Sequence, residues 1–249
     1  MHRLAALLLF LALLLPAPIL AAEPIAIFGN DSAPPKSWVE GGHPRGILVD
    51  ILREVEARTG LSFEIKLMPW KRAYMNALED RGGIFGLSMN KERKGLFDFS
   101  EVMYFDEMRL VVLKGREFAY HSVEDLKCMT VGVTRGASYG DDYDRAKGRI
   151  FVPSEDSSPV SRLRMLLAGR IDAALLGPGK ASVRMALNKD DALRENSDKF
   201  VILDAPFNRD ANYIGFTKTL RQTEVLKLID RALKAMRKDG TIARIEARY

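Results

Sequence analysis

Apolar and polar residues follow one another along the first half of the chain in a pattern that predicts strands and helices in turn. A helix is expected over Ile47–Thr59, where apolar residues recur at helical spacing and Gly60 provides the stop, and a second over residues 70–80. Strands are expected at residues 25–28, 61–68, 84–89 and 109–113. This order is typical of a mostly parallel sheet covered by helices.

The same pattern starts again after Gly115. Strands are expected at residues 129–133, 150–152, 171–176, 200–203 and 213–216. Helices are expected at residues 138–146, 161–168 and 181–187, with a last apolar helical face between Val225 and Met236 that ends at Gly240. Two consecutive α/β units with a closing helix predict two lobes and a cleft between them, which is where ligands bind in open α/β folds.

The amino terminus has the features of an export signal. Residues 4–15 are twelve consecutive apolar residues between Arg3 and Pro16, too few to cross a bilayer, which takes about 20. A basic start, a short apolar stretch and then small residues predict a cleavable signal peptide over residues 1–22. The alternative is an uncleaved signal anchor. No cysteine follows the stretch, so a lipoprotein anchor is not expected.

Composition excludes several classes of protein. The chain of 249 residues is 47% hydrophobic and 29% charged, which excludes intrinsic disorder, and its single cysteine, Cys128, excludes a disulfide scaffold. We expect Cys128 to be a small buried apolar residue. The 38 basic residues are scattered among 33 acidic ones, a distribution that argues against nucleic-acid binding.

The sequence shows no catalytic motif. Its three histidines are far apart, and none has the spacing of a metal site. The glycine-rich turn Gly177-Pro178-Gly179-Lys180 lacks the first glycine and the final Ser or Thr of a phosphate-binding loop. We therefore predict no catalytic residue, no cofactor and no metal.

Residues 68–104 carry a resemblance to a known family. They read Met-Pro-Trp-Lys-Arg-Ala, then Gly86-Leu-Ser-Met-Asn-Lys-Glu-Arg93, then Phe97-Asp-Phe-Ser100. This resembles the bacterial extracellular solute-binding proteins of family 3, the periplasmic receptors of polar-amino-acid ABC transporters. Three further stretches agree in order along the chain: Val131-Gly-Val-Thr-Arg-Gly136, Leu167-Ala-Gly-Arg-Ile-Asp-Ala173 and Met236-Arg-Lys-Asp-Gly-Thr-Ile-Ala243.

The resemblance implies an α/β, two-lobed, type II periplasmic-binding-protein fold, with two mixed sheets flanked by helices, a hinge and an interlobe cleft. It places lobe 1 at residues 23–112 and 204–249 and lobe 2 at residues 113–203. It implies a monomeric periplasmic protein that captures a small polar, carboxylate-bearing, amino-acid-like solute and closes on it, with an inner-membrane ABC permease as partner. Stable membrane insertion is not expected. An enzyme on the same fold, dehydratase-like or peptidoglycan-cleaving, and a ligand-binding partner of a sensor kinase are the alternatives.

The resemblance also suggests ligand-binding residues. Arg93 stands where family members grip the ligand carboxylate, and a guanidinium suits that task because it is a planar, permanently charged fork. Ser88 would add a hydroxyl donor, and Asn90 stands at the family's usual threonine. Trp70 would form a flat apolar wall. Ser138 is expected at a helix start, where free N–H groups favour anions.

One position departs from the family pattern. Amino-acid-binding members carry an acid, about five residues after the Asp-Ala of the strand motif, that pairs with the ligand ammonium. Here that position is Gly177, followed by Pro178, and no acid stands nearby. A buried ammonium without a counter-charge costs several kcal/mol, so the identity of the solute stays open unless an acid comes from elsewhere.

Overall fold

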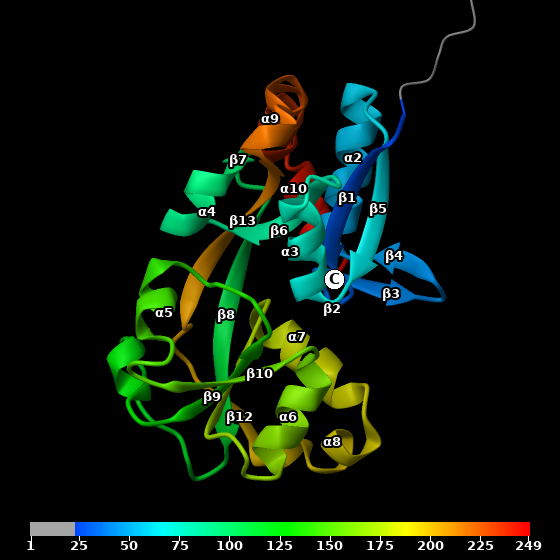
Figure 1. Ribbon diagram of the computed structural model, residues 1–249. Helices are drawn as coiled ribbons and strands as arrows, with labels where there is room; N and C mark the ends of the chain where they lie inside the picture. Colours follow the sequence, from blue (N-terminus) through cyan, green and yellow to red (C-terminus); the bar gives the residue numbers. More distant parts are fainter. Residues whose placement is uncertain (1–22) are drawn as a thin grey trace, which may run out of the picture.

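The computed structural model describes residues 23–249, and its core falls into two parts. The predicted signal peptide lies outside the described residues. One part of the core joins residues between Ile27 and Met103 with residues between Ile214 and Ile245. The other joins residues between Met108 and Phe207. We call the first part lobe 1 and the second lobe 2; they form the upper and lower halves of Figure 1.

Lobe 1 is a mixed sheet with helices on both faces. Helix α2 (Ile47–Thr59) buries an apolar stripe that includes Ile51, Leu52 and Val55, and it ends at Gly60, whose φ of 74° is left-handed. The long helix α9 packs on the same face, and α3 covers the opposite face with α4 beside it. Its sheet contains β1 (Ile25–Asn30), β5 (Phe63–Met68), β6 (Gly83–Ser88) and β7 (Phe97–Phe99). The strands β2 (Ser32–Ala33), β3 (Ser37–Glu40) and β4 (His43–Arg45) form a separate three-stranded sheet. The other helices are α3 (Trp70–Leu78), α4 (Lys91–Leu96), α9 (Thr223–Lys238), α10 (Thr241–Glu246) and the short η4 (Lys218–Leu220).

Lobe 2 repeats the plan on a smaller scale. Parallel strands β9 and β10 lie beside β11, with one apolar cluster on each face of the sheet. Its strands are β9 (Thr130–Thr134), β10 (Val152–Asp156), β11 (Ala173–Leu176) and β12 (Phe200–Ile202). Its helices are α5 (Asp141–Ala146), α6 (Pro159–Leu167), α7 (Gly179–Asn188), α8 (Asp191–Glu195) and the short η2 (Val123–Leu126) and η3 (Ser197–Lys199).

Two long antiparallel strands join the lobes. β8 (Tyr104–Leu113) pairs with β11 in lobe 2 and with β13 (Asn208–Thr217), and β13 pairs in turn with β6 in lobe 1. The strand order is therefore one path through both lobes, β10-β9-β11-β8-β13-β6-β1-β5, and Figure 1 shows β8 and β13 running between the two halves. We call β8 and β13 the hinge strands.

The predicted helices and strands have counterparts in the structure, which adds β2, β3, β4, β7, α4, α8 and α10 to them. The segments predicted at 109–113 and 213–216 are the ends of much longer strands. Cys128, predicted to be buried, is exposed. It lies in a turn before β9 with a φ of 65°, and its backbone N–H donates to the carbonyl of Ile150, so the turn places its side chain outside the apolar cluster.

Candidate functional site

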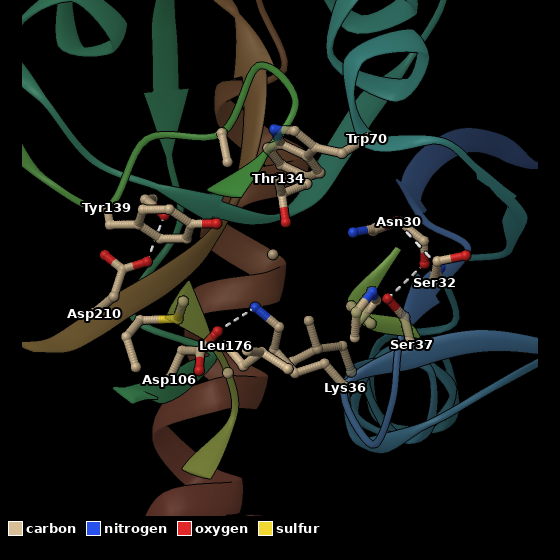
Figure 2. A pocket seen from close by; sticks show the side chains of 18 of the residues that line it. Asn30, Ser32, Lys36, Ser37, Trp70, Asp106, Thr134, Tyr139, Leu176 and Asp210 are labelled. Atoms are coloured by element: carbon tan, nitrogen blue, oxygen red, sulfur yellow. Dashed lines mark hydrogen bonds and ion pairs between the residues drawn. The ribbon is translucent and has the colours of Figure 1, made fainter. Parts of the chain in front are cut away.

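A pocket lies between the lobes, and residues from both lobes and both hinge strands line it (Figure 2). The empty space among its lining residues is about 680 Å³, a volume that includes open solvent at the mouth. Its larger apolar lining residues are Leu48, Trp70 and Phe85 from lobe 1, Met108 from β8 and Leu176 at the end of β11.

Two carboxylates face the pocket from the hinge strands. Asp106 on β8 and Asp210 on β13 are directly opposed in the antiparallel register, so the two acids are close neighbours. Both are buried, with 1% and 8% of their surface exposed. Like charges in this arrangement repel each other, and the strands can carry them only because other groups offset the charge.

Lys36 supplies the opposite charge. It reaches across the pocket from the loop between β2 and β3 and forms an ion pair with Oδ2 of Asp106 (Figure 2). Its Nζ also donates to Oδ1 of Asn212 over 3.2 Å. Burial by itself lowers the pKa of Lys36, but the charges of Asp106 and Asp210 outweigh it, so the pKa is raised and the ammonium stays charged.

The backbone of Lys36 is held by the start of α2. The carbonyls of Pro35 and Lys36 accept hydrogen bonds of 3.0 Å from the N–H groups of Ile47 and Leu48. Gly46, just before the helix, has a φ of 122°, and a Cβ there would lie 2.3 Å from the Lys36 carbonyl oxygen. The loop and the helix end therefore fit together only with glycine at this position.

Asp210 is held by donors instead of by a direct ion pair. Its Oδ2 accepts hydrogen bonds from the Ser88 hydroxyl and, over 3.0 Å, from the Asn212 amide. Burial raises the pKa of Asp210 to about 6, although the Ser88 hydrogen bond and the charges of Lys36 and Arg93 act in the opposite direction. Asp210 is thus a cleft carboxyl that titrates close to neutral pH.

Arg162 also lines the pocket, but its charge is already neutralised. Its Nε and Nη2 each donate to a different oxygen of Asp156 over 2.8 Å, in the bidentate geometry that guanidinium favours. It also donates to the Leu175 carbonyl and, over 2.8 Å, to the Thr134 hydroxyl. Only 2% of Arg162 is exposed, and these contacts identify it as a structural residue of lobe 2.

Three of the five residues predicted from sequence line the pocket. Ser88 and Trp70 do so from lobe 1 and Ser138 from lobe 2. The indole Nε1 of Trp70 donates to the carbonyl of Gly136 over 3.3 Å, which joins the lobes. Ser138 is not at the start of a helix as expected, because α5 begins only at Asp141.

Asn90 and Arg93 lie beside the pocket and are not among the residues that line it. The Asn90 side chain caps α4 by accepting from the backbone N–H of Arg93 over 2.8 Å. The Arg93 guanidinium donates to the Ser88 carbonyl over 2.9 Å and lies 5.0 Å from the centre of the Tyr74 ring. Direct contact of these two side chains with a solute stays a prediction.

Sequence reasoning did not find the three charged residues Lys36, Asp106 and Asp210. Lys36 follows two prolines in a loop, and each aspartate stands next to another charged residue, Glu107 or Arg209, in a part of its strand where polar and apolar residues do not alternate regularly. Only the pairing of β8 with β13 brings the two acids together. One weak signal existed: Asp106 stands two and four residues before the apolar Met108 and Leu110, so on a strand it shares their face.

The chain matches the model of the bacterial extracellular solute-binding proteins, family 3, over residues 25–249. It belongs to this family. The L-cystine-binding protein TcyJ of Escherichia coli (strain K12) is 24% identical over 219 residues, which are 87% of this chain and 78% of that protein. The putative amino-acid ABC transporter-binding protein PatH of Vibrio harveyi is 23% identical over 240 residues, 94% of this chain and 91% of that protein.

Solved structures of similar proteins have the same fold. An ancestral arginine-binding protein bound to glutamine matches with a TM-score of 0.73 at 22% identity, covering 91% of this chain and 97% of the other. A histidine kinase sensor domain with similarity to periplasmic binding proteins matches with the same TM-score at 21% identity, covering 92% and 96%. The predicted two-lobed α/β fold of periplasmic binding proteins is confirmed.

Two further observations concern residues 23–249. None of the helices in this range is long and apolar enough to cross a membrane. Within the same range, no three histidine, cysteine or carboxylate side chains are grouped in a way that could hold a metal ion.

The raised pKa of Asp210 predicts a pH dependence of stability. Because the folded state keeps the Asp210 proton up to about pH 6 while the unfolded chain loses it near pH 3.8, folding becomes less favourable as pH rises through this window. A shift of about two pKa units corresponds to about 3 kcal/mol. We therefore compare the unfolding free energies of Asp210→Asn and wild type by urea denaturation at pH 3.5 and at pH 7.5. The difference between the two proteins should shift by about 3 kcal/mol in favour of the variant as the pH rises from 3.5 to 7.5. Parallel pH profiles of the two proteins would contradict this assignment.

Proposed function

We propose that this protein captures a small polar, carboxylate-bearing, amino-acid-like solute in the interlobe pocket and presents it to the permease of an ABC transporter. One observation carries the proposal: residues from both lobes and both hinge strands line a single pocket. A solute in that position would contact both lobes at once and favour the conformation in which they are closed together. The family and the names of the curated relatives support an amino-acid-like solute in the periplasm.

Hydrogen bonds across the rim of the pocket support closure by a hinge motion. From lobe 1, the Asn90 amide donates to Oδ2 of Asp144 over 2.7 Å and to the Ser138 hydroxyl over 3.1 Å. The backbone N–H of Lys91 donates to Oδ1 of Asp141 over 2.9 Å. These contacts form only while the lobes are together, so their free energy adds to that of the bound solute.

Ser88 and Ser138 are proposed to contact the solute through their hydroxyl groups, and Trp70 to provide the flat apolar wall of the pocket, since all three line it. In this structure the Ser88 hydroxyl donates to Asp210 and the Ser138 hydroxyl donates to Asp144, so each would donate to the solute only by turning away from its carboxylate. Arg93 is proposed to act on the solute carboxylate. Its guanidinium is 4% exposed and forms no ion pair with a carboxylate within the described residues, so its charge remains available to the site. Burial strengthens such an interaction, because water does not screen it.

The proposed function is tested in two steps. Native mass spectrometry of the purified protein would show a small molecule that co-purifies with it. Isothermal titration calorimetry against the twenty common amino acids and L-cystine would then give the affinities. Binding of at least one carboxylate-bearing solute is expected; absence of binding throughout the panel, with no co-purified molecule, would contradict the proposal. Loss of uptake on deletion of the gene would distinguish transport from sensing.

The role of Arg93 predicts a selective loss of binding. Arg93→Gln should abolish measurable binding of the tightest-binding amino acid, because the solute carboxylate would lose its cation. The control compound is the amine that corresponds to this amino acid without its carboxylate. Its Kd values for wild type and variant should lie within threefold of each other. Calorimetry on both compounds measures this, with thermal unfolding as the check on folding. An equal loss for both compounds would indicate that Arg93 acts only by supporting Ser88, and unchanged affinity for the amino acid would remove it from the site.

The rim contacts predict a smaller effect. Asp144→Ala removes the acceptor of the Asn90 amide across the rim and of the Ser138 hydroxyl within lobe 2. Since Asp144 is exposed, we assign the lost rim hydrogen bond about 1 kcal/mol, about a fivefold rise in Kd. The matched control is Asp142→Ala on the same helix, because Asp142 pairs only with Arg145 of that helix. Small-angle scattering of the ligand-free protein should show a larger radius for Asp144→Ala than for the control. Equal radii and equal affinities would exclude a role of these contacts in closure.

One observation favours catalysis as a second candidate function. An enzyme on this fold would need a cleft carboxyl with a raised pKa, and Asp210 has that property. Incubation of the bound solute with the protein, followed by mass spectrometry, separates the two functions. A receptor returns the solute unchanged, whereas an enzyme converts it with a rate that falls in Asp210→Asn.

A further inference from the structure

One oxygen of the Asp106 carboxylate takes part in none of the contacts described above. Its Oδ2 pairs with Lys36, but its Oδ1 is buried and has no hydrogen-bond partner among the described residues. Asp106 is 1% exposed and lines the pocket. A buried carboxylate oxygen without a donor is costly, so such an oxygen in a binding pocket indicates a donor that arrives from outside the chain.

This oxygen occupies space next to Gly177 of lobe 2 that a larger residue would need. A Cβ built on Gly177 would lie 2.3 Å from Oδ1 of Asp106 and 2.4 Å from the sulfur of Met108. The φ of Gly177 lies outside the range in which side chains are strained, so backbone conformation does not demand a glycine here. What demands it is the space that the Asp106 carboxylate occupies.

The charges that line the pocket favour a cation at this oxygen. Within the described part of the chain they are Lys36, Asp106, Asp210 and Arg162. Arg162 is neutralised by Asp156, which leaves one lysine facing two carboxylates. Lys36 engages a single oxygen of Asp106 and cannot balance both acids.

We infer that Oδ1 of Asp106, on hinge strand β8 and in the space left open by Gly177, receives an ammonium group of the solute. The inference rests on the proposed function and narrows its solute class to molecules that carry an ammonium as well as a carboxylate. The acid that pairs with the ammonium would then be Asp106 of the hinge strand β8 and not a residue at position 177. Its carboxylate occupies the space beside the end of β11 that a side chain at position 177 would need. An ammonium offers three compact N–H donors, which suits a carboxylate oxygen that has no donor of its own.

The test compares pairs of solutes. The probes are the twenty common amino acids and L-cystine, each paired with the compound in which hydrogen replaces the α-ammonium. For every amino acid that binds wild type, we expect the ammonium-free partner to bind at least 30-fold more weakly. Asp106→Asn should weaken the amino acid at least tenfold and leave the two partners within about threefold of each other. The control, Glu107→Gln, changes the next residue of β8, whose carboxylate pairs with Arg109, and should bind as wild type does.

A second variant covers the case in which Asp106→Asn does not fold. Gly177→Ala keeps both charges but places a methyl group on the Asp106 carboxylate, so it should also weaken amino acids more than their ammonium-free partners. Equal binding of the paired solutes by wild type, or an undiminished preference for the ammonium in both variants, would overturn the inference while leaving the proposed function standing. Absence of binding by any probe would overturn the proposed function, and the inference with it.

Discussion

The electrostatic repulsion between Asp106 and Asp210 determines how the pocket is built. The two carboxylates are directly opposed on β8 and β13, buried, and shared between the lobes. Lys36 neutralises one of them, and Ser88 and Asn212 donate to the other. Each of these groups is supplied by a different segment, so the segments must come together in one arrangement for the two acids to be tolerated.

The two ion pairs that line the pocket differ in whether every carboxylate oxygen has a hydrogen-bond donor. Arg162 and Asp156 satisfy each other with two hydrogen bonds, and the remaining donors of the guanidinium are used by the protein. The pair of Lys36 and Asp106 leaves one carboxylate oxygen without a donor. A satisfied pair holds lobe 2 together, whereas an unsatisfied one has a remaining capacity to bind.

The sequence predicted the fold well because local patterns determine its helices and short strands. The apolar stripe of α2, for example, is visible as four residues at helical spacing before a glycine. The hinge strands were predicted only at their apolar ends, because in their other halves, residues 104–108 and 208–212, charged and amide residues stand without regular alternation with apolar ones. Three of the predicted site residues line the pocket, and Asn90 and Arg93 lie beside it.

The acids and the lysine of the pocket could not be predicted, because their proximity depends on the pairing of strands far apart in the chain. The sequence around Gly177 offers no acid at the family's position, and the carboxylate that fills that space belongs to Asp106 on β8. A glycine gives no information about which distant side chain requires it. Likewise, nothing in the sequence of the loop between β2 and β3 indicates that the Lys36 side chain reaches Asp106 on hinge strand β8.

The location of the two acids on the hinge strands has a consequence for the order of events during binding. When two bodies rotate about a pivot, atoms at the pivot travel less than atoms at the rim. A cationic group held by Asp106 would therefore meet nearly the same surroundings in the open and closed forms of the proposed motion, whereas the contact of Asn90 with Asp144 at the rim would be made and broken with every cycle. Recognition at the pivot would govern which molecules are retained on first encounter, and the rim would govern how long they stay.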